Sequence, residues 1–404
     1  MRGAIIPANR CVFFTRNGLI FVSPFRFGLK IIAIAIVLSL FLICLSELFH
    51  RQQIVISIAT NKSPPSSLCN EAKNGRSNHL EVLATDDTDI EDIGDTEAKP
   101  NRTIRPLCPA LPDFLGPVLS LVPENVTDVM TRMMENKTRV TMDNFEIENL
   151  FGVKEGGFWE PTSCAARFRS AIVIPFRDRL PHLYALLWRL HSLLQKQKIA
   201  YGIFVVEQEG DGAFNKGRLM NAAFLYIRDR HPSYDCIIFH DVDMLPEDDR
   251  NMYACTHRPK HLSPAVSELN YRLPYQELVG GVFAISPTDF MLVNGFSNSF
   301  WGWGGEDDDM WYRLDAHRIR IDRSKFHIGR YTMILHEKRQ SAPRDYIKTL
   351  LNSSKVRYKE DGLNQLHSSG CSIINAQVKP TFVHIVVEIG SKAPWESRSG
   401  ESRH

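Results

Sequence analysis

The hydrophobic pattern of the C-terminal half of the chain alternates between two periods. Mainly apolar runs that predict buried strands occur at 171–176, 201–208 and 235–244, with a closing strand at 382–389. Between the first two runs, leucine recurs at helical spacing through 183–194, and 216–230 predicts a second helix. Strands that alternate with helices build a mostly parallel sheet flanked by helices, so the pattern predicts an α/β fold. The carboxyl ends of such strands face a ligand crevice.

A second apolar run, at 31–46, carries no charge. Five basic residues and no acidic residue precede it, and Glu47 is the first acid of the chain. A cleaved signal peptide is the alternative, but no small-residue cleavage site clearly follows the run. We therefore predict a retained transmembrane anchor at 29–49, close to the ~20 residues that a bilayer requires. The basic flank, 1–28, would stay cytosolic and the rest of the chain would be luminal.

Few large apolar side chains recur between about 57 and 104, where Pro64 and Pro65 precede an acidic run at 86–97. Such a segment cannot bury a core, and its acidic run is typical of a solvated spacer. We predict the following division after the anchor: a stem at 50–105, one globular domain at 106–392 and a disordered tail at 393–404.

Composition narrows the class of partner. Hydrophobic residues make up 44% of the chain, which is enough for a sizeable core. The 48 basic and 46 acidic residues nearly balance, so nothing indicates nucleic acid, which requires a concentrated basic face. Five of the eight cysteines lie at or after Cys108, as expected of a domain that folds in an oxidising lumen. Glycosylation sequons, usable in that compartment, occur at Asn61, Asn101, Asn125, Asn136 and Asn352.

Two aspartates, Asp241 and Asp243, follow the apolar residues of the third predicted strand. On a strand their side chains would share one face, because the side-chain period is two. Paired carboxylates at a strand end can hold a divalent cation that neutralises a diphosphate. The alternative is a solvated or capping pair.

A second cluster runs through 301–309, where two tryptophans and three glycines precede four acids. The acids could simply favour the positive end of a following helix, which we predict at 310–318. The tryptophans indicate more, since indole faces bind sugar rings and glycines let a lid bend.

Met333 and His336 form the third candidate. A core methionine and a structural histidine are the alternative reading of this pair. As metal ligands, a thioether and an imidazole would favour a transition ion such as Mn²⁺ over Mg²⁺.

Together these clusters resemble the β-1,4-galactosyltransferase family, over about 108–390. The matching stretches are IPFRDR (174–179), VVEQ (205–208), FNKGRLMN (214–221), FHDVDMLPEDDRNMY (239–253), GGV (280–282), VNGFSNSFWGWGGEDDDM (293–310) and DGLN (361–364). The resemblance implies an A-type glycosyltransferase fold behind a Golgi membrane anchor. It also implies inverting transfer from a UDP-sugar to the 4-hydroxyl of a terminal β-linked GlcNAc on glycoproteins or glycolipids.

The resemblance also implies a role for individual residues. The donor would contact Pro175, Phe176, Arg177, Arg179, Phe214, Lys216, Val242, Asp243, Leu278, Gly281 and the lid residue Trp303. The cofactor Mn²⁺ would be held by Asp243, Met333 and His336. The acceptor would contact Tyr275, Gly305, Glu306, Asp307 and Asp308, with Asp307 as catalytic base beside Glu306. Disulfides would join Cys108 to Cys164 and Cys236 to Cys255.

Three departures from the family pattern bear on specificity. Lys216 stands where the mammalian galactosyl enzymes have Arg, and the region 337–360 differs from the family's acceptor loop in length and content. Leu278 stands where galactose-specific vertebrate members have Tyr, and a shorter apolar side chain leaves room for an N-acetyl group. We therefore predict UDP-GalNAc as the donor, with UDP-galactose as the alternative. A xylose-acting enzyme and a non-catalytic sugar-binding protein are remoter alternatives, because the GGEDDD motif, the base and the metal ligands are all present.

Overall fold

The computed structural model describes residues 12–15, 18–21, 105–135, 142, 151–336 and 341–390. Contacts divide the chain into two units, Met1–Glu97 and Ala98–His404. In the first unit, β1 (Val12–Thr15) pairs antiparallel with β2 (Gly18–Phe21), a hairpin that the sequence pattern did not predict. The predicted anchor, the tail at 393–404 and all of the predicted stem before Arg105 lie outside the described residues. Within the described ranges, no helix combines the length and apolar character needed to cross a membrane.

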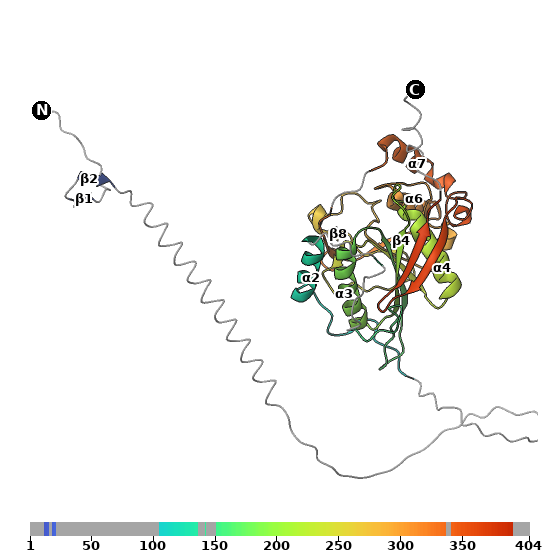
Figure 1. Ribbon diagram of the computed structural model, residues 1–404, viewed down its shortest axis with the longest axis horizontal. Coiled ribbons are helices and arrows are strands. Elements are labelled where there is room, and N and C mark those ends of the chain that lie inside the picture. The colour runs from blue at the N-terminus through green and yellow to red at the C-terminus, as the bar shows by residue number, and fades with distance from the viewer. Residues whose placement is uncertain are drawn as a thin grey trace, which may run out of the picture. The chain divides into compact units, whose positions relative to one another are not determined.

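The second unit is built on an eight-stranded mixed sheet (Figure 1). Its strand order is β10-β7-β9-β5-β3-β4-β13-β12. In that order the strands span Asp322–Arg323, Lys260–His261, Val282–Ile285, Cys236–His240, Arg169–Phe176, Ala200–Gln208, Val383–Glu388 and Ser372–Val378. The central strands β5, β3, β4 and β13 are parallel, whereas β9 and β12 run antiparallel to their neighbours. The mixed α/β architecture predicted from the pattern is therefore confirmed.

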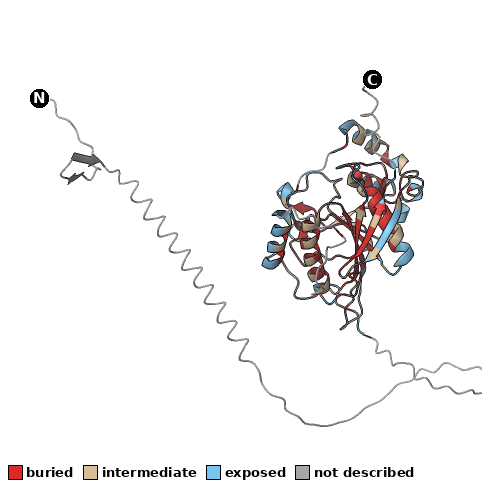
Figure 2. Cartoon of the chain, viewed as in Figure 1, coloured by how far each residue is buried: buried red, intermediate tan, exposed pale blue. Residues whose placement is uncertain are grey.

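Helices cover both faces of this sheet, and the central strands are therefore buried along most of their length (Figure 2). On β3, Ile172 and Ile174 pack in one core with the leucines of α3 (Leu180–Lys196). The alternate residues, Ala171 and Val173, pack in a second core with α4 (Lys216–Arg230).

The remaining elements lie around this framework. The other helices are α2 (Glu124–Glu135), α5 (Pro287–Leu292), α6 (Glu306–Ala316) and α7 (Arg344–Arg357), with 3₁₀ turns η2 (Ser267–Leu269) and η3 (Leu363–Gln365). A three-stranded sheet is formed by β6 (Met244–Pro246), β11 (Arg330–Met333) and β8 (Ala265–Val266).

The predicted strand at 235–244 is wrong at its C-terminal end. Strand β5 ends at His240, and Asp241 to Asp243 form a turn that leads into β6. Two backbone hydrogen bonds fix this turn: Asp241 N–H donates to Gly281 O at 2.9 Å, and Met244 N–H donates to Asp241 O at 3.3 Å. The two aspartates therefore project from a turn, and the strand period does not decide where they point.

Two further boundaries differ from the predicted ones. Helix α6 begins at Glu306, four residues before the predicted start, because Gly305 adopts φ +96° and its carbonyl accepts Asp309 N–H at 2.9 Å. The predicted closing strand is β13, but β12 pairs along its outer side and forms the edge of the sheet instead.

The structure contains the disulfides Cys108–Cys164 and Cys236–Cys255, the pairs that the resemblance implies. Of the cysteines it describes, Cys371 alone is free, and it is buried. The sequon residues Asn125 and Asn352 are exposed on α2 and α7. The other three sequons begin outside the described residues.

Candidate active site

The candidate site forms where three segments meet: the turn after β5, the N-terminus of α4 and the first turn of α6. Lys216, the first residue of α4, joins them, since its Nζ lies 2.6 Å from Asp241 Oδ1 and 3.2 Å from Glu306 Oε1. Burial alone would lower the pKa of Lys216, but the two carboxylates raise it well above its usual value. The site therefore keeps one fixed positive charge among several acids.

The position of Lys216 follows from the way α4 begins. The side chain of Asn215 caps the helix by accepting Arg218 N–H at 2.9 Å, and Asn215 N–H donates to Gln208 Oε1 at 2.8 Å. The start of α4 is thereby tied to the carboxyl end of β4, and Lys216 faces the acids.

The predicted metal ligands come together where β6 and β11 pair. Met333 lies opposite Met244 in the antiparallel register, and Ile334 N–H donates to Asp243 O at 2.8 Å. This pairing brings His336 Nδ1 to 3.1 Å from Asp243 Oδ2.

The chemistry of these residues fits a transition cation. Burial, followed by the charge of the neighbouring Asp241, raises the pKa of Asp243 to about 6, although His336 opposes the shift. A bound cation would offset the desolvation of the Asp243 carboxylate and its repulsion by Asp241. In the described ranges, no three His, Cys, Asp or Glu side chains cluster as a metal site. The candidate set contains two such residues and the thioether of Met333, a combination of oxygen, nitrogen and sulfur donors that suits Mn²⁺ better than Mg²⁺.

Asp307 stands against the backbone at Gly280. A Cβ atom at residue 280 would lie 2.5 Å from Asp307 Oδ2, so the close approach requires glycine. Burial, followed by the charges of Glu306 and Asp308, raises the pKa of Asp307 to about 8, although Lys216 opposes the shift. A carboxyl group with a raised pKa is a stronger proton acceptor once it is ionised.

Asp308 faces a different partner. The hydroxyl of Tyr275 donates a hydrogen bond to its carboxylate. Asp308 Oδ1 is buried and has no hydrogen-bond partner in the described part of the chain. A buried carboxylate oxygen without a donor favours a ligand hydroxyl group at this position.

The two tryptophans of the glycine-rich cluster differ in role. Trp301 is buried beneath the guanidinium of Arg218, 4.7 Å from the ring centroid. Trp303 is 63% exposed, next to Gly302, whose N–H donates to Phe214 O at 2.7 Å. Only Trp303 can therefore present its indole face to a bound sugar.

The residues implied for nucleotide binding lie at the ends of β3 and β4. Pro175 and Phe176 are buried at the end of β3, and Arg179 precedes α3. Arg177 Nη1 donates to Gly212 O at 2.7 Å, and its guanidinium lies 5.3 Å from the centroid of the Phe214 ring. Val242 is buried within the turn after β5.

Leu278 lies half-buried in the loop before β9. Arg323 Nη2 donates to Leu278 O at 3.1 Å and also to Gln276 O. At the end of the loop Gly281 has φ +83°, and a Cβ there would lie 2.6 Å from Ser263 Oγ. The loop is thus fixed by the hydrogen bonds of Arg323 and by close packing at Gly281.

Direct contacts join Lys216 with Glu306, Asp243 with His336, and Tyr275 with Asp308. Within the part of the chain that the structure describes, neither Leu278 nor Trp303 forms a hydrogen bond or ring contact with these acids. The sequence pattern missed Arg323 and the partnership of Asp241 with Lys216. No local signal marks Arg323, since it belongs to a two-residue strand, and the Asp241 pair joins residues far apart in the chain.

Two protein-family models match the sequence of this chain. The family model described as the N-terminal region of glycosyl transferase group 7 matches residues 122–256. The model described as the N-terminal domain of galactosyltransferase matches residues 260–337.

Curated relatives agree with these matches. Human β-1,4-galactosyltransferase 2 is 36% identical over 267 residues, which cover 66% of this chain and 71% of the relative. Mouse β-1,4-galactosyltransferase 4 is 40% identical over 261 residues, 64% of this chain and 73% of the relative. A crystal structure of a mutant Drosophila β-1,4-galactosyltransferase 7 with manganese, UDP-Gal and xylobiose aligns at 24% identity and a TM-score of 0.47. It covers 57% of this chain and 97% of its own. On the sequence matches, the chain belongs to the β-1,4-galactosyltransferase family.

Proposed function

We propose that this chain is a Mn²⁺-dependent, inverting glycosyltransferase that moves a hexose from a UDP-sugar to the 4-hydroxyl of a terminal β-linked GlcNAc. One observation carries the proposal. The first turn of α6 places Asp307, whose pKa is raised, beside Asp308, which has an unpartnered buried oxygen. Lys216 bonds both this turn and the turn that holds Asp243. We infer from these contacts that the proton acceptor, the acceptor-binding group and the metal site lie close together.

Asp243, Met333 and His336 would hold the cation. When bound, Mn²⁺ neutralises the diphosphate and stabilises the charge on the UDP leaving group. Lys216 adds a compact positive charge at the same point, and a lysine gives one phosphate contact where arginine could give two. Phe214 and Val242 pack on the nucleotide, and the exposed indole of Trp303 covers the donor sugar.

Asp307 acts on the acceptor. Its ionised carboxylate accepts the proton of the GlcNAc 4-hydroxyl as that oxygen attacks the anomeric carbon from the face opposite UDP. The new carbon–oxygen bond forms as the bond to the diphosphate breaks, so the configuration inverts without an enzyme-bound sugar. Asp308 and Tyr275 hold the acceptor hydroxyl groups.

The test is product analysis with the full-length chain, Mn²⁺ and a GlcNAc-terminated acceptor, offered each common UDP-sugar in turn. We expect a β1-4-linked disaccharide terminus, formed only with a divalent cation present. Failure to transfer from any UDP-sugar would contradict the proposal and favour the non-catalytic sugar-binding alternative.

For the donor we propose UDP-GalNAc, because of Leu278. A tyrosine at this position would fill the space beside the 2-substituent of the donor sugar and restrain it through its hydroxyl. Leucine is shorter and apolar, so an acetamido group can enter. A second candidate, UDP-galactose, is favoured by the names of the relatives described above, which are β-1,4-galactosyltransferases.

Leu278→Tyr separates these two candidates. We expect the wild-type chain to have the higher kcat/KM with UDP-GalNAc and the variant to shift the ratio toward UDP-galactose by about 10- to 100-fold, since one pocket contact is worth ~1–3 kcal/mol. A higher wild-type kcat/KM with UDP-galactose would show that the chain is a galactosyltransferase.

We also propose a Golgi location with the catalytic domain in the lumen. The uncharged run at 31–46 behind a basic segment supports it, as do the two disulfides. A run of this length suits the thinner membranes of the early secretory pathway. Sequencing the mature N-terminus tests the anchor: a terminus downstream of Ser46 would show that the segment is cleaved.

A further inference from the structure

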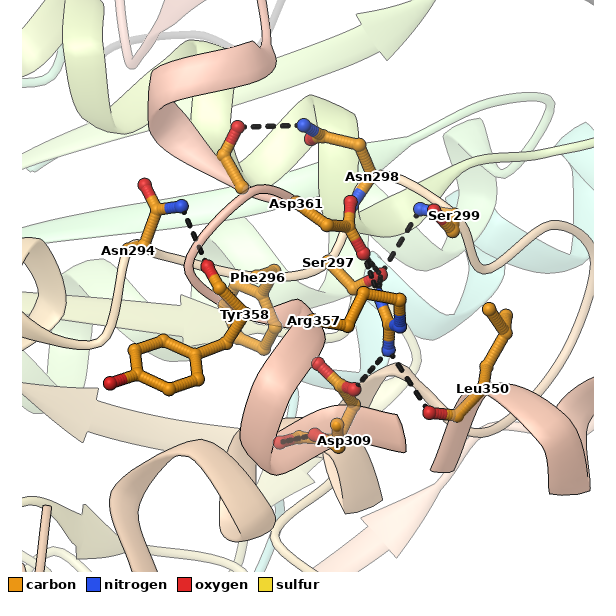
Figure 3. A network of polar contacts seen from close by, with 12 residues as sticks. Asn294, Phe296, Ser297, Asn298, Ser299, Asp309, Leu350, Arg357, Tyr358 and Asp361 are labelled. Atoms are coloured by element: carbon orange, nitrogen blue, oxygen red, sulfur yellow. Dashed lines mark hydrogen bonds and ion pairs between the residues drawn. The ribbon is translucent and has the colours of Figure 1, made fainter. Parts of the chain in front are cut away.

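Two carboxylates and two guanidinium groups form a closed ion-pair network that joins α6 to α7, the Asp309 cluster: Asp309, Arg313, Arg357 and Asp361. Figure 3 shows three of its members, Asp309, Arg357 and Asp361. Asp309 Oδ2 lies 2.5 Å from Arg313 Nε and its Oδ1 lies 2.5 Å from Arg357 Nη2. Asp361 bonds Arg357 as well and lies 3.6 Å from Arg313. Each carboxylate thus has two cationic partners.

Because the network is buried, desolvation of its charges limits how much it can stabilise the fold. Asp309 and Arg313 have no exposed surface, and Asp361 is also buried. A buried ion pair must repay the desolvation of both charges, and well-packed apolar residues often serve stability as well. The Asp309 cluster is therefore better explained by the geometry that it imposes on α6 than by its contribution to stability.

The geometry concerns the orientation of α6. Asp309 follows Asp307 by two residues, which on an α-helix turns its side chain by roughly 200°. Asp307 faces Gly280 and the site, whereas Asp309 points back into the cluster. Whatever holds Asp309 consequently sets the rotation of α6 about its axis, and with it the direction of Asp307.

Arg313 belongs to α6 itself, so it moves with the helix. Arg357 is the external anchor, because it is the last residue of α7. Its Nη1 also bonds Ser297 Oγ at 2.8 Å, and Asp361 accepts Asn298 N–H at 2.8 Å. Ser297 and Asn298 lie just before the segment that carries Trp303.

A second contact keeps α7 on the same loop. Tyr346, in the first turn of α7, donates its hydroxyl to Ser299 O at 3.0 Å. The guanidinium of Arg357 also lies 5.6 Å from the centroid of the Phe300 ring. Both ends of α7 therefore contact the residues that lead to the tryptophan segment.

We propose that Arg357 is a positioning residue for the transfer step. By bonding Asp309 and Asp361 together, it fixes the rotation of α6 and aims Asp307 at the acceptor hydroxyl, so turnover depends on the docking of α7. This inference rests on the proposed role of Asp307 as the base.

The test compares Arg357→Met with the wild-type full-length chain. We expect kcat to fall about 10- to 100-fold, since a small displacement of a catalytic group has effects of this size. Binding of UDP and Mn²⁺ should change by less than about twofold, because the donor ligands lie outside the cluster. Arg357→Lys, which keeps the charge but offers one point contact, should recover part of the loss.

Lys355→Met is the matched control. Lys355 Nζ also links α7 to α6, at 2.5 Å from Asp315 Oδ2, but that pair is exposed. We expect its kcat to stay within about twofold of the wild type.

An unchanged kcat in Arg357→Met, measured well below its melting temperature, would overturn the inference. A parallel loss of donor binding would also overturn it, because it would show a general loosening of the domain. If Arg357→Met does not fold, Arg357→Lys decides, and a wild-type kcat there rejects the inference. Asp307→Asn keeps the two proposals apart: if it stays active, the base assignment fails, and if it is inactive beside a normal Arg357→Met, only the positioning role fails.

Discussion

Asp309 lies in the first turn of α6 together with Glu306, Asp307 and Asp308, but its charge is balanced in a different way from theirs. Lys216 bonds Glu306, and the charges of Glu306 and Asp308 help to raise the pKa of Asp307 to about 8. The next residue, Asp309, has a guanidinium on each oxygen. Unmatched charge marks the part of the helix that awaits a ligand, and matched charge marks the part that holds it in place.

This comparison separates two kinds of consequence. The unmatched region consists of Glu306, Asp307 and Asp308. Removing one of these acids should lower activity and leave folding intact, because the repulsion between them is relieved. Removing a member of the matched cluster should cost stability first, because it leaves a buried charge without its partner. Four changes to the protein test this difference, and the first should alter its behaviour most.

Asp243→Ala should have the largest effect, on function alone. It removes the carboxylate that faces His336, so we expect no Mn²⁺-dependent binding of UDP-sugar and no detectable transfer. Calorimetric titration and a thermal melt check both halves. A melting temperature at or above that of the wild type is expected, because burial raises the pKa of this carboxyl and its ionised form strains the folded state. Full activity in the presence of a chelator would contradict the metal site.

Arg313→Met should be the most damaging change to folding. Arg313 is fully buried between Asp309 and Asp361, and breaking such a pair costs about 3–5 kcal/mol. Urea unfolding of the variant and of Lys355→Met, which removes an exposed pair worth at most ~1 kcal/mol, gives the difference directly. Equal unfolding midpoints in the two variants would show that the buried cluster contributes no more to stability than an exposed ion pair.

Asp307→Asn should lower kcat by about 10²- to 10⁴-fold and spare donor binding, because an amide cannot accept the proton. Steady-state kinetics and UDP binding measure the two effects. Its fold should be as stable as that of the wild type, in keeping with its place in the unmatched region. Turnover close to that of the wild type would exclude Asp307 as the base.

The pH profile should show the smallest effect. Asp307 must be ionised to act, and its pKa of about 8 means that kcat falls as the pH drops through the neutral range. Glu306→Gln removes one of the charges that raise this pKa and frees the charge of Lys216. The acid limb should therefore move to lower pH, by about one unit. A limb that stays in place, or moves to higher pH, would mean that another group controls it.

Local patterns predicted much of the central fold. The pattern predicts strands β3 and β4 because both of their faces are buried, and it predicts α4 from its helical periodicity, whereas the capping role of Asn215 appears only in the structure. The end of β5 was missed because Asp241 N–H bonds Gly281 O, forty residues later in the chain. Two-residue strands such as β7 and β10 carry no pattern of their own.

The site residues also fall into two groups: those that sequence motifs predict and those whose contacts required the tertiary structure. Motif resemblance supplied Asp243, Asp307 and His336, since their types and spacings are distinctive. The partnership of Lys216 with Asp241 and the bonds of Arg357 required the tertiary structure, because their partners come from separate segments. A histidine and an aspartate 93 residues apart by number can be predicted to meet only from a known family, and here their distance is 3.1 Å.

The Cys236–Cys255 disulfide has a practical consequence for producing the protein. It bridges residues 19 apart, and the enclosed loop contains the turn with Asp241 and Asp243 together with β6. Closing a loop of this length stabilises a fold by about 3 kcal/mol. In the reducing cytosol of an expression host this disulfide would not form. The strand that leads into the metal-site turn would then lose its covalent link to Cys255. Expression in an oxidising compartment, or in a strain engineered to form disulfides, is therefore the rational choice for every measurement above.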